Sequence, residues 1–242
     1  MNQPLRFIKQ VFIRLFGPKS YWRAKSLLDR FYDSYRNTTY SQFGEDVFLR
    51  KYFNYKSNGF FVDIGAFHPV QFSNTYALYK TKNWSGINID ARPNSKILFD
   101  RIRPNDCNVE ALVSNKKEEF KYYSWGDHSE NTIIENQAQA LTQRLGPPLE
   151  VKNMTSRPLY EILDEYAPKN SQIDFISVDV EGHDLEVLKS NNWELYSPRL
   201  VLTEGFFNNV DEVINSELYK FLIDQKYHLK AWLNPTLVFE KN

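Results

Sequence analysis

Short runs rich in β-branched and aromatic residues alternate with longer amphipathic segments from about residue 41 to the last residues of the chain. Strands that alternate with helices of this length are typical of βαβ units, in which neighbouring strands run parallel and helices cover both faces of the sheet. The last two runs, YHLKAWLN and TLVFEK, are joined by a turn around Asn234-Pro235, so they must be antiparallel to each other. The sequence therefore predicts an α/β fold with a mostly parallel sheet of about seven strands, one of them reversed.

The expected elements follow one another in a regular order. Strands are expected over 59–67, 85–90, 108–114, 173–180 and 198–205 and in the closing hairpin, and residues 118–125 could form an extra strand. Helices are expected from a cap near Ser41, over 73–82, after Pro93, over 158–166, from Asp184 and over 210–225. Residues 124–157 depart longest from the alternation and are expected to form an insertion, with a helix near 131–144 followed by Gly-Pro-Pro and a short extended piece.

Four of the expected strands end in an acidic residue. These acids are Asp63, Asp90, Asp179 and Glu204. In open α/β sheets, ligands bind beyond the carboxyl ends of the strands, near the point where the strand order reverses. One such acid is unremarkable, but four together predict a site at this edge of the sheet.

The turn after Asp63 and the acid at position 90 indicate a nucleoside site. Gly65 has no Cβ, so a ligand can approach the backbone closely, and a carboxylate at Asp90 stands at a spacing common for binding a ribose diol. A dinucleotide is disfavoured because GAFHP replaces G-x-G-x-x-G, and Phe67 and Pro69 would crowd a pyrophosphate. S-adenosylmethionine, which has a carboxylate, an ammonium group and a ribose but no phosphate, fits better. A purely structural turn is the alternative.

The motifs and their order resemble those of the FkbM-type S-adenosylmethionine-dependent methyltransferases. The resemblance runs from Ser41 to the last strand and rests on SQFGED (41–46), FVDIGAFHP (61–69), SNTY (73–76), GINIDARP (86–93) and ISVDVEGHDLEVL (176–188). It implies the class I methyltransferase (Rossmann-like) fold over residues 41–242. It also implies O-methylation, frequently of a sugar hydroxyl in polysaccharide, glycolipid or natural-product biosynthesis.

The expected cofactor contacts combine the resemblance with the strand-end chemistry. The residues assigned to S-adenosylmethionine binding are Gln42, Asp63, Gly65, Ala66, Asn74, Asp90 and Asp179. Asp63 is expected to accept from the ammonium group, and Asn74 with Thr75 could bind the carboxylate or cap a helix. Asp106 is a weaker candidate for the adenine amino group.

Glu181, His183 and Asp179 are the candidate catalytic residues. Because a sugar hydroxyl has a high pKa, a base must take its proton as the new bond forms, or a cation must lower that pKa. Glu181 is preferred as base, because it resembles the second acid of a D-x-[DE] motif in related sugar methyltransferases. His183 has an ordinary pKa nearer neutrality, although a helix N-terminus disfavours its charged form. Asp179 is expected beside the sulfonium and the acceptor.

A metal route competes with the general base. Asp179, Glu181 and Glu204 could hold Mg²⁺, which prefers oxygen ligands. Related metal-dependent enzymes carry two acids on the next strand, where this chain has Thr203-Glu204, so no metal ligand is assigned. Asp184 and Glu186 are expected to face solvent or to favour the helix dipole in its first turn.

The overall charge and the insertion bear on partners. Thirty basic and thirty acidic residues leave no net charge to attract nucleic acid. The resemblance to the FkbM-type enzymes implies a glycan or glycolipid acceptor. The insertion would cover that acceptor, with Trp125, Asp127, His128 and Asn131 stacking on or hydrogen-bonding a sugar. Two alternatives remain: a non-catalytic module that binds S-adenosylmethionine or a glycan, and a dinucleotide-dependent nucleotide-sugar enzyme.

Residues 1–40 lie outside the resemblance and are expected to form an amphipathic helical extension. One helical face carries Leu5, Ile8, Val11, Phe12, Leu15 and Phe16, and the other carries Arg6, Lys9, Gln10 and Arg14. Gly17-Pro18 should end this helix, with a second helix over about 20–34. Charges interrupt every apolar run, so the segment neither spans a membrane nor directs secretion. A cytoplasmic protein is expected, with residues 1–19 packed on protein or lying on the inner face of a membrane.

Overall fold

A computed structural model describes residues 3–32, 37–169 and 172–242 of the chain, without the side chains of 3–8 and 28–32. The chain divides into two compact units, residues 1–38 and residues 39–242, which are described separately. Within the described ranges, none of the helices combines the length and the apolar run that a membrane-crossing segment needs.

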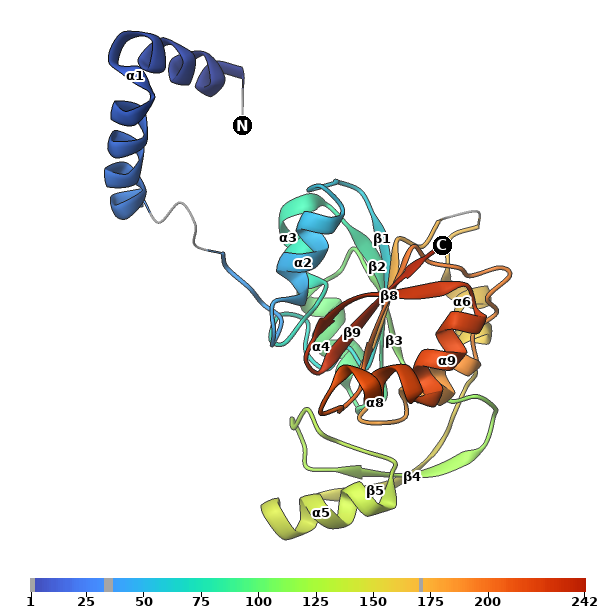
Figure 1. Cartoon of the computed structure of the whole chain (residues 1–242). Helices are drawn as coiled ribbons and strands as arrows, with labels where there is room; N and C mark the ends of the chain where they lie inside the picture. Colours follow the sequence, from blue (N-terminus) through green and yellow to red (C-terminus); the bar gives the residue numbers. More distant parts are fainter. Residues whose placement is uncertain (1–2, 33–36, 170–171) are drawn as a thin grey trace. The chain divides into compact units, whose positions relative to one another are not determined.

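The N-terminal unit is the helical segment α1 (Gln3–Tyr32), which bends sharply in the middle (Figure 1). Gly17 has a φ of 77°, outside the helical region, and Pro18 follows it, so two helices meet at this kink. The expected break at Gly17-Pro18 is therefore confirmed. The side chains of Leu5, Arg6 and Ile8, and residues 33–34, lie outside the described part.

The second unit is built on a seven-stranded sheet. Its strand order is β3-β2-β1-β6-β7-β9-β8. The strands are β1 (Phe60–Ile64), β2 (Ser85–Asp90), β3 (Cys107–Glu110), β6 (Phe175–Val178), β7 (Leu200–Glu204), β8 (Tyr227–Leu233) and β9 (Thr236–Lys241). β9 runs antiparallel to both of its neighbours, β7 and β8, and the other six strands of this sheet run in one direction. The strand order reverses between β1 and β6, which is where the acids were expected to meet.

Helices cover both faces of the sheet (Figure 1). One face carries α2 (Glu45–Tyr52), α3 (Tyr76–Lys82) and α4 (Ser95–Ile102); the other carries α6 (Leu159–Tyr166), α7 (Asp184–Lys189), α8 (Val210–Asn215) and α9 (Glu217–Asp224). Alternate residues of β1 belong to different cores, because side chains alternate along a strand. Phe61 packs in the cluster with Leu49 and Trp84, whereas Val62 and Ile64 pack in the cluster of the opposite face. The predicted α/β class is confirmed.

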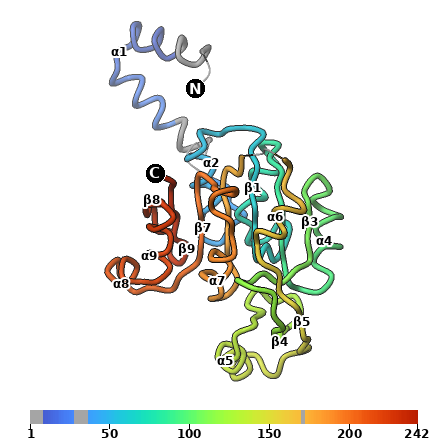
Figure 2. The backbone as a smooth tube through the Cα atoms, turned by 90° about the vertical axis from the view of Figure 1, so that its right-hand side faces the viewer, coloured from blue at the N-terminus to red at the C-terminus, as the bar shows by residue number. Residues whose placement is uncertain are grey.

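The insertion forms a small sheet of its own. β4 (Glu119–Ser124) pairs antiparallel with β5 (Glu150–Thr155), and α5 (Glu135–Leu145) lies between them in the chain. Figure 2 shows these elements together beyond one end of the main sheet. The extra strand expected over 118–125 is thus present, but its partner strand was foreseen only as a short extended piece.

Three expected helix boundaries were wrong. The helix expected over 73–82 begins at Tyr76, whose backbone N–H donates to the Ser73 hydroxyl in the preceding turn. The helix expected over 210–225 is two helices, because the Ser216 hydroxyl accepts a hydrogen bond from the backbone N–H of Tyr219 and caps α9. The helix expected from a cap at Ser41 begins at Glu45, with Gly44 as its N-cap residue. The Ser41 hydroxyl instead donates to the Asp46 carboxylate, which also accepts from Thr39 and ties this preceding segment to α2.

Candidate active site

A cleft of about 610 Å³ opens at the carboxyl ends of β1, β2 and β6. We call it the main cleft. Its sheet side is lined by Ile64, Gly65, Phe67, Ile89, Asp90, Ala91, Arg92, Ala111, Leu112, Val113, Asp179, Val180, Glu181 and His183. The insertion supplies the opposite wall through Tyr122, His128, Ser129, Asn131, Thr132 and Ile133. The insertion therefore completes the same cleft that the strand ends begin.

A smaller cleft of about 320 Å³ lies on the other side of Asp179. Its lining consists of Gln42, Glu45, Phe72, Asn74, Ser177, Val178, Asp179, Leu202, Glu204 and Thr236. Asp179 lines both clefts, so its carboxyl group stands at their junction. Two of the residues expected to bind the cofactor, Gln42 and Asn74, lie in this smaller cleft. The Asn74 amide donates to the Ser177 hydroxyl at 3.1 Å, which fixes its orientation.

The turn after β1 is pressed against the backbone of Asp179. Gly65 has a φ of 76°, and a Cβ there would lie 1.7 Å from the Asp179 carbonyl oxygen. The backbone N–H groups of Gly65 and Ala66 both donate to the carbonyl of Ile89, at 2.9 and 3.1 Å. Gly65 lines the main cleft, whereas Ala66 is buried and lines neither cleft. Glycine is therefore needed at position 65 for two reasons. The backbone at the end of β6 leaves no room for a Cβ, and a ligand could approach this turn closely only if no Cβ is present.

Asp90 ends β2 with its carboxylate held by the backbone. Oδ1 accepts from the N–H of Arg92 and Oδ2 from the N–H of Phe67, both at 2.8 Å. Each carboxylate oxygen has a second lone pair, so both can still accept from a pair of hydroxyls. Burial raises the pKa of Asp90 to about 6, against the opposing effect of these backbone hydrogen bonds. The expected position beside a ribose is compatible with this geometry and stays a prediction.

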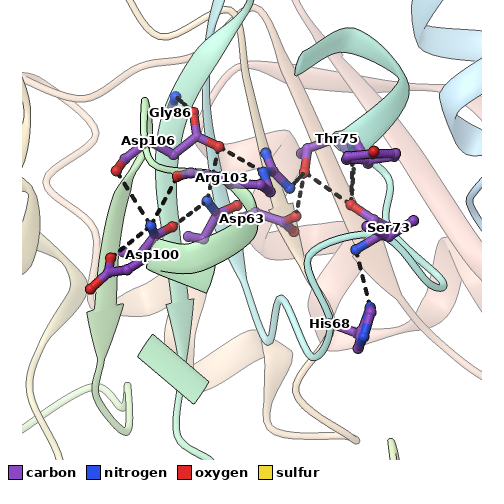
Figure 3. Close-up of polar contacts among 12 residues, drawn as sticks. Asp63, His68, Ser73, Thr75, Gly86, Asp100, Arg103 and Asp106 are labelled. Carbon is purple, nitrogen blue, oxygen red and sulfur yellow. Dashed lines mark hydrogen bonds and ion pairs between the residues drawn. The ribbon is translucent and has the colours of Figure 1, made fainter. Parts of the chain in front are cut away.

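Asp63 lies below the clefts in a buried polar row that crosses the sheet. The row pairs Asp63 with Asn88 on one side and with Ser177 on the other. The Thr75 hydroxyl donates to the Asp63 carboxylate at 2.9 Å and accepts from Arg103 at 2.9 Å (Figure 3). Burial raises the pKa of Asp63 to about 6, although the Arg103 charge opposes it. Asp63 lines neither cleft, and its expected contact with an ammonium group stays untested.

The expectation that Asp106 contacts adenine was wrong. Its carboxylate forms a fully buried ion pair with Arg103 at 2.7 Å and accepts from the N–H of Gly86 at 3.1 Å (Figure 3). Gly86 is near the amino end of β2, whereas the main cleft lies at the carboxyl end. Asp106 therefore serves the core and not the site.

Four carboxyl groups gather where β6, β7 and α7 meet. Asp179 and Glu204 are hydrogen-bonded to each other, which requires one shared proton. Burial and the neighbouring negative charge of Glu204 raise the pKa of Asp179 well above its usual value. Burial and Asp184 raise that of Glu204 to about 7. Asp184 does stand in the first turn of α7, but it is buried rather than solvent-facing, and it accepts from the Thr203 hydroxyl and the Glu204 N–H.

Glu181 enters the main cleft from a strained turn. Its φ is 55°, in the left-handed region that non-glycine residues rarely adopt. Burial, with the negative charge of Glu204 next in importance, raises the pKa of its carboxyl group to about 8. A carboxyl group with a pKa near neutrality can both accept and release a proton under ordinary conditions.

His183 is already engaged inside the cleft. Its Nε2 lies 2.9 Å from the Ser114 hydroxyl, and its ring contacts Phe120 edge-on with centroids 5.7 Å apart. Burial lowers the pKa of the imidazole, so it is neutral near pH 7. The geometry therefore favours Glu181 over His183 as the group available to take a proton. Both assignments remain predictions.

The acids form no evident metal centre. Across the described residues, no group of three or more His, Cys, Asp or Glu side chains has an arrangement that could hold a metal ion. The Mg²⁺ alternative, with Asp179, Glu181 and Glu204 as ligands, is not tested by this observation.

Of the insertion residues expected to meet a sugar, only His128 and Asn131 line the main cleft. Asn131 holds its own loop, because its side chain accepts from the Trp125 N–H and donates to the Gly126 carbonyl. The Trp125 indole donates to the Gly146 carbonyl at 2.9 Å. Asp127 pairs with Arg92 across the cleft at 2.6 Å.

Sequence reasoning missed two functional candidates in the main cleft. Arg92 is 8% exposed and bridges the insertion to the β1 turn by donating to Asp127 and to the Phe67 carbonyl. Tyr122 is buried in β4 and faces the cleft, and burial raises the pKa of its hydroxyl. The motif GINIDARP contained the signal for Arg92, two residues after a strand-end acid. Tyr122 gave no signal, because it reaches the site only through the insertion fold.

Comparison with known proteins adds two findings. The family model described as the Methyltransferase FkbM domain matches residues 63–229. No curated protein sequence matches the chain.

Solved structures with a similar arrangement include three methyltransferases. An RNA methyltransferase candidate from Pyrococcus horikoshii is 9% identical, with a TM-score of 0.42, and 82% of each chain is covered. A precorrin-6y C5,15-methyltransferase from Geobacter metallireducens is 13% identical, with a TM-score of 0.42, covering 81% of this chain and 87% of that one. Phosphoethanolamine N-methyltransferase 1 from Haemonchus contortus, in complex with phosphoethanolamine and S-adenosylhomocysteine, is 10% identical, with a TM-score of 0.32, covering 95% of this chain and 46% of that one.

Proposed function

We propose, since this chain belongs to the FkbM methyltransferase family, that it is an S-adenosylmethionine-dependent O-methyltransferase acting on a sugar hydroxyl of a glycan or glycolipid. Methyl transfer is the activity of the family. We further propose that the methyl group is transferred to an oxygen atom and that the acceptor is a glycan. We also propose that the reaction belongs to polysaccharide biosynthesis and that the protein is cytoplasmic. The observation that carries the choice of oxygen is Glu181, a cleft carboxyl group whose pKa is raised to about 8.

The two clefts suit S-adenosylmethionine in their chemistry. The apolar residues Ala111, Leu112 and Val113 along one wall suit a purine, and the two free lone pairs of Asp90 suit a ribose diol. The amides of Gln42 and Asn74 in the smaller cleft suit an amino-acid group. The negative charges near Asp179 suit a sulfonium cation.

When bound, S-adenosylmethionine supplies an activated methyl group, so the chain's own residues must align the acceptor and remove its proton. We assign Glu181 as the general base. The O–H bond of the acceptor breaks, and the proton passes to a carboxylate oxygen of Glu181. Asp179, with its pKa raised and hydrogen-bonded to Glu204, adds less negative charge beside the acceptor than a free carboxylate would. The insertion wall excludes water from the same cleft.

The acceptor proposal follows from the chemistry of the site. The carboxyl groups of Asp179, Glu181 and Glu204 offer no positive charge to an acidic group at the reacting position, which favours a neutral hydroxyl. His128 and Asn131, at the insertion wall, are placed to hydrogen-bond a sugar.

The decisive experiment measures methyl transfer from S-adenosylmethionine to extracted glycans and glycolipids, together with S-adenosylhomocysteine affinity by calorimetry. Glu181→Gln should lower turnover by about 10²-fold with the affinity nearly unchanged. Asp90→Ala should weaken the affinity first. Turnover of the natural sequence should rise with pH and level off above about 8, because Glu181 must be unprotonated to act.

Glu186→Gln is the matched control, because Glu186 lies on the same segment but pairs with Lys189 outside the clefts. Full turnover in Glu181→Gln, or a larger loss in His183→Gln, would contradict the assignment of the base. Normal S-adenosylhomocysteine binding without transfer to any acceptor would instead favour the alternative, a non-catalytic binding module.

A further inference from the structure

The N-terminal segment has a charge balance unlike that of the rest of the chain. Residues 1–28 contain six basic residues and no acidic residue: Arg6, Lys9, Arg14, Lys19, Arg23 and Lys25. The whole chain has 30 of each sign, so residues 29–242 carry 24 basic and 30 acidic residues, a net charge of −6. Such asymmetry indicates that the basic segment meets a polyanionic partner that the rest of the chain would avoid.

The same segment exposes large apolar side chains. The exposed fractions are 40% for Val11, 69% for Leu15, 61% for Phe16, 56% for Trp22 and 60% for Leu27. Five such residues within 17 positions are a local concentration of exposed apolar side chains, which is typical of an interaction site. A partner that offered only negative charge would leave this apolar surface in water.

Contacts across the kink fix the two helical arms against each other. The Phe12 ring contacts Phe16 at 4.9 Å and Tyr21 of the second arm at 6.0 Å. The Lys9 ammonium lies 5.4 Å from the centre of the Trp22 ring, so a basic group and an aromatic ring lie side by side. Tryptophan and lysine together are typical of residues at the level of lipid headgroups.

We propose that this unit, residues 3–32 of α1, binds in the plane of an anionic lipid bilayer. The exposed apolar side chains enter the boundary between headgroups and acyl chains, and the basic side chains contact the anionic headgroups. The lipid surface is preferred over nucleic acid because it takes up the apolar and the basic residues together. The inference is independent of the methyl-transfer activity.

Vesicle flotation of the full-length protein tests the proposal. The protein should float with vesicles of phosphatidylcholine mixed with phosphatidylglycerol, and high salt should reduce this binding. Leu15→Asp should lower the partition coefficient by about tenfold or more, because it places a charge among the acyl chains. The double variant Lys19→Gln, Arg23→Gln should lower it roughly 30-fold, and binding to pure phosphatidylcholine should be weak throughout.

Leu195→Asp is the matched control, because Leu195 is also 69% exposed but lies in the second unit. It should float like the natural sequence. The proposal is overturned if the full-length protein does not float with the anionic vesicles, or if Leu15→Asp floats equally well. A third outcome would also overturn it: the natural sequence does not float, sedimentation shows that it is an oligomer, and Leu15→Asp dissociates that oligomer. The apolar side chains would then be covered by a second copy of the chain. Nucleic-acid binding without flotation would overturn it as well.

Discussion

At the scale of single residues, the site depends on backbone positions that few side chains tolerate. Gly65, Phe67 and Glu181 all have φ between 48° and 76°, and all three line the main cleft. Only the first is a glycine, so the other two hold a left-handed conformation at a cost of about 1 kcal/mol each. A strained backbone conformation persists where neighbouring contacts hold it in place. For Phe67, one such contact is the hydrogen bond that its N–H donates to the Asp90 carboxylate.

Gly65→Ala should be strongly destabilising. Its Cβ would fall 1.7 Å from the Asp179 carbonyl oxygen, so the end of β6 must move away from β1. We expect a loss of roughly 3 kcal/mol or more in the free energy of unfolding, measured with denaturant, and loss of S-adenosylhomocysteine binding. Gly44→Ala separates strain from the clash, because Gly44 has a left-handed backbone (φ 87°, ψ 21°) with nothing within 4 Å of its Cβ position. It should lose only about 1 kcal/mol; equal losses in both variants would show that the contact with Asp179 does not matter.

Individual residue roles could be predicted only in part. Asp90 and Asp179 were assigned from their positions at strand ends, and Glu181 from its resemblance to the second acid of a D-x-[DE] motif. The structure places all three in the lining of the main cleft. Asp63 was assigned by the same rule, but Arg103 and Thr75 hold its side chain inside the core. Its partners across the sheet are Asn88 and Ser177, so Asp63 lies two residues short of the level of Asp90 and Asp179 on the same face of the sheet.

At the scale of elements, the strands of the main sheet were more predictable than the insertion. Strand ends follow from local apolar runs, and β2 has the bounds that were expected. The pairing of β4 with β5 joins segments on opposite sides of α5, and no short-range pattern specifies such a pairing. Tyr122 reaches the site only through this pairing, which explains why sequence reasoning missed it, whereas the signal for Arg92 was present in the motif GINIDARP.

The insertion should depend on Arg92 for its position over the cleft. Arg92 donates to Asp127 at 2.6 Å and to the Phe67 carbonyl at 2.7 Å, which ties the insertion to the turn after β1. Asp127→Ala should weaken S-adenosylhomocysteine binding by about three- to tenfold and speed amide exchange over 126–133, because the wall loses this tether. The melting temperature should change by less than about 2 °C, since Asp127 is 97% exposed.

Arg157→Ala provides the comparison for the tether. Arg157 pairs with Glu165 at 2.7 Å on the exposed surface and lines neither cleft. Its ligand affinity and exchange rates over 126–133 should stay unchanged. Slower exchange or unchanged affinity in Asp127→Ala would mean that the insertion is positioned by other contacts.

At the scale of the whole molecule, the acids of the second unit make its stability depend on pH. Burial raises the pKa of Asp63, Asp90 and Asp184 to about 6, of Glu204 to about 7 and of Glu181 to about 8. Each value lies above that of an unfolded chain, so the folded state binds more protons in this range. This contribution to stability is present below about pH 4 and is lost as pH rises through the folded-state values.

The melting temperature should therefore fall by on the order of 5 °C as pH rises from 6 to about 8.5. If the protein contained only ion-paired carboxylates on its surface, its melting temperature would stay level over this interval. Glu204→Gln should flatten this fall, because it removes one carboxyl group with a raised pKa and also the negative charge that raises the pKa of both Asp179 and Glu181. Asp100→Asn is the control, since Lys96 holds the pKa of this exposed carboxyl group below its usual value. A melting temperature that rises over this interval, or a slope that Glu204→Gln leaves intact, would show that the cluster is ionised at little cost and that the pKa of Glu181 is not raised.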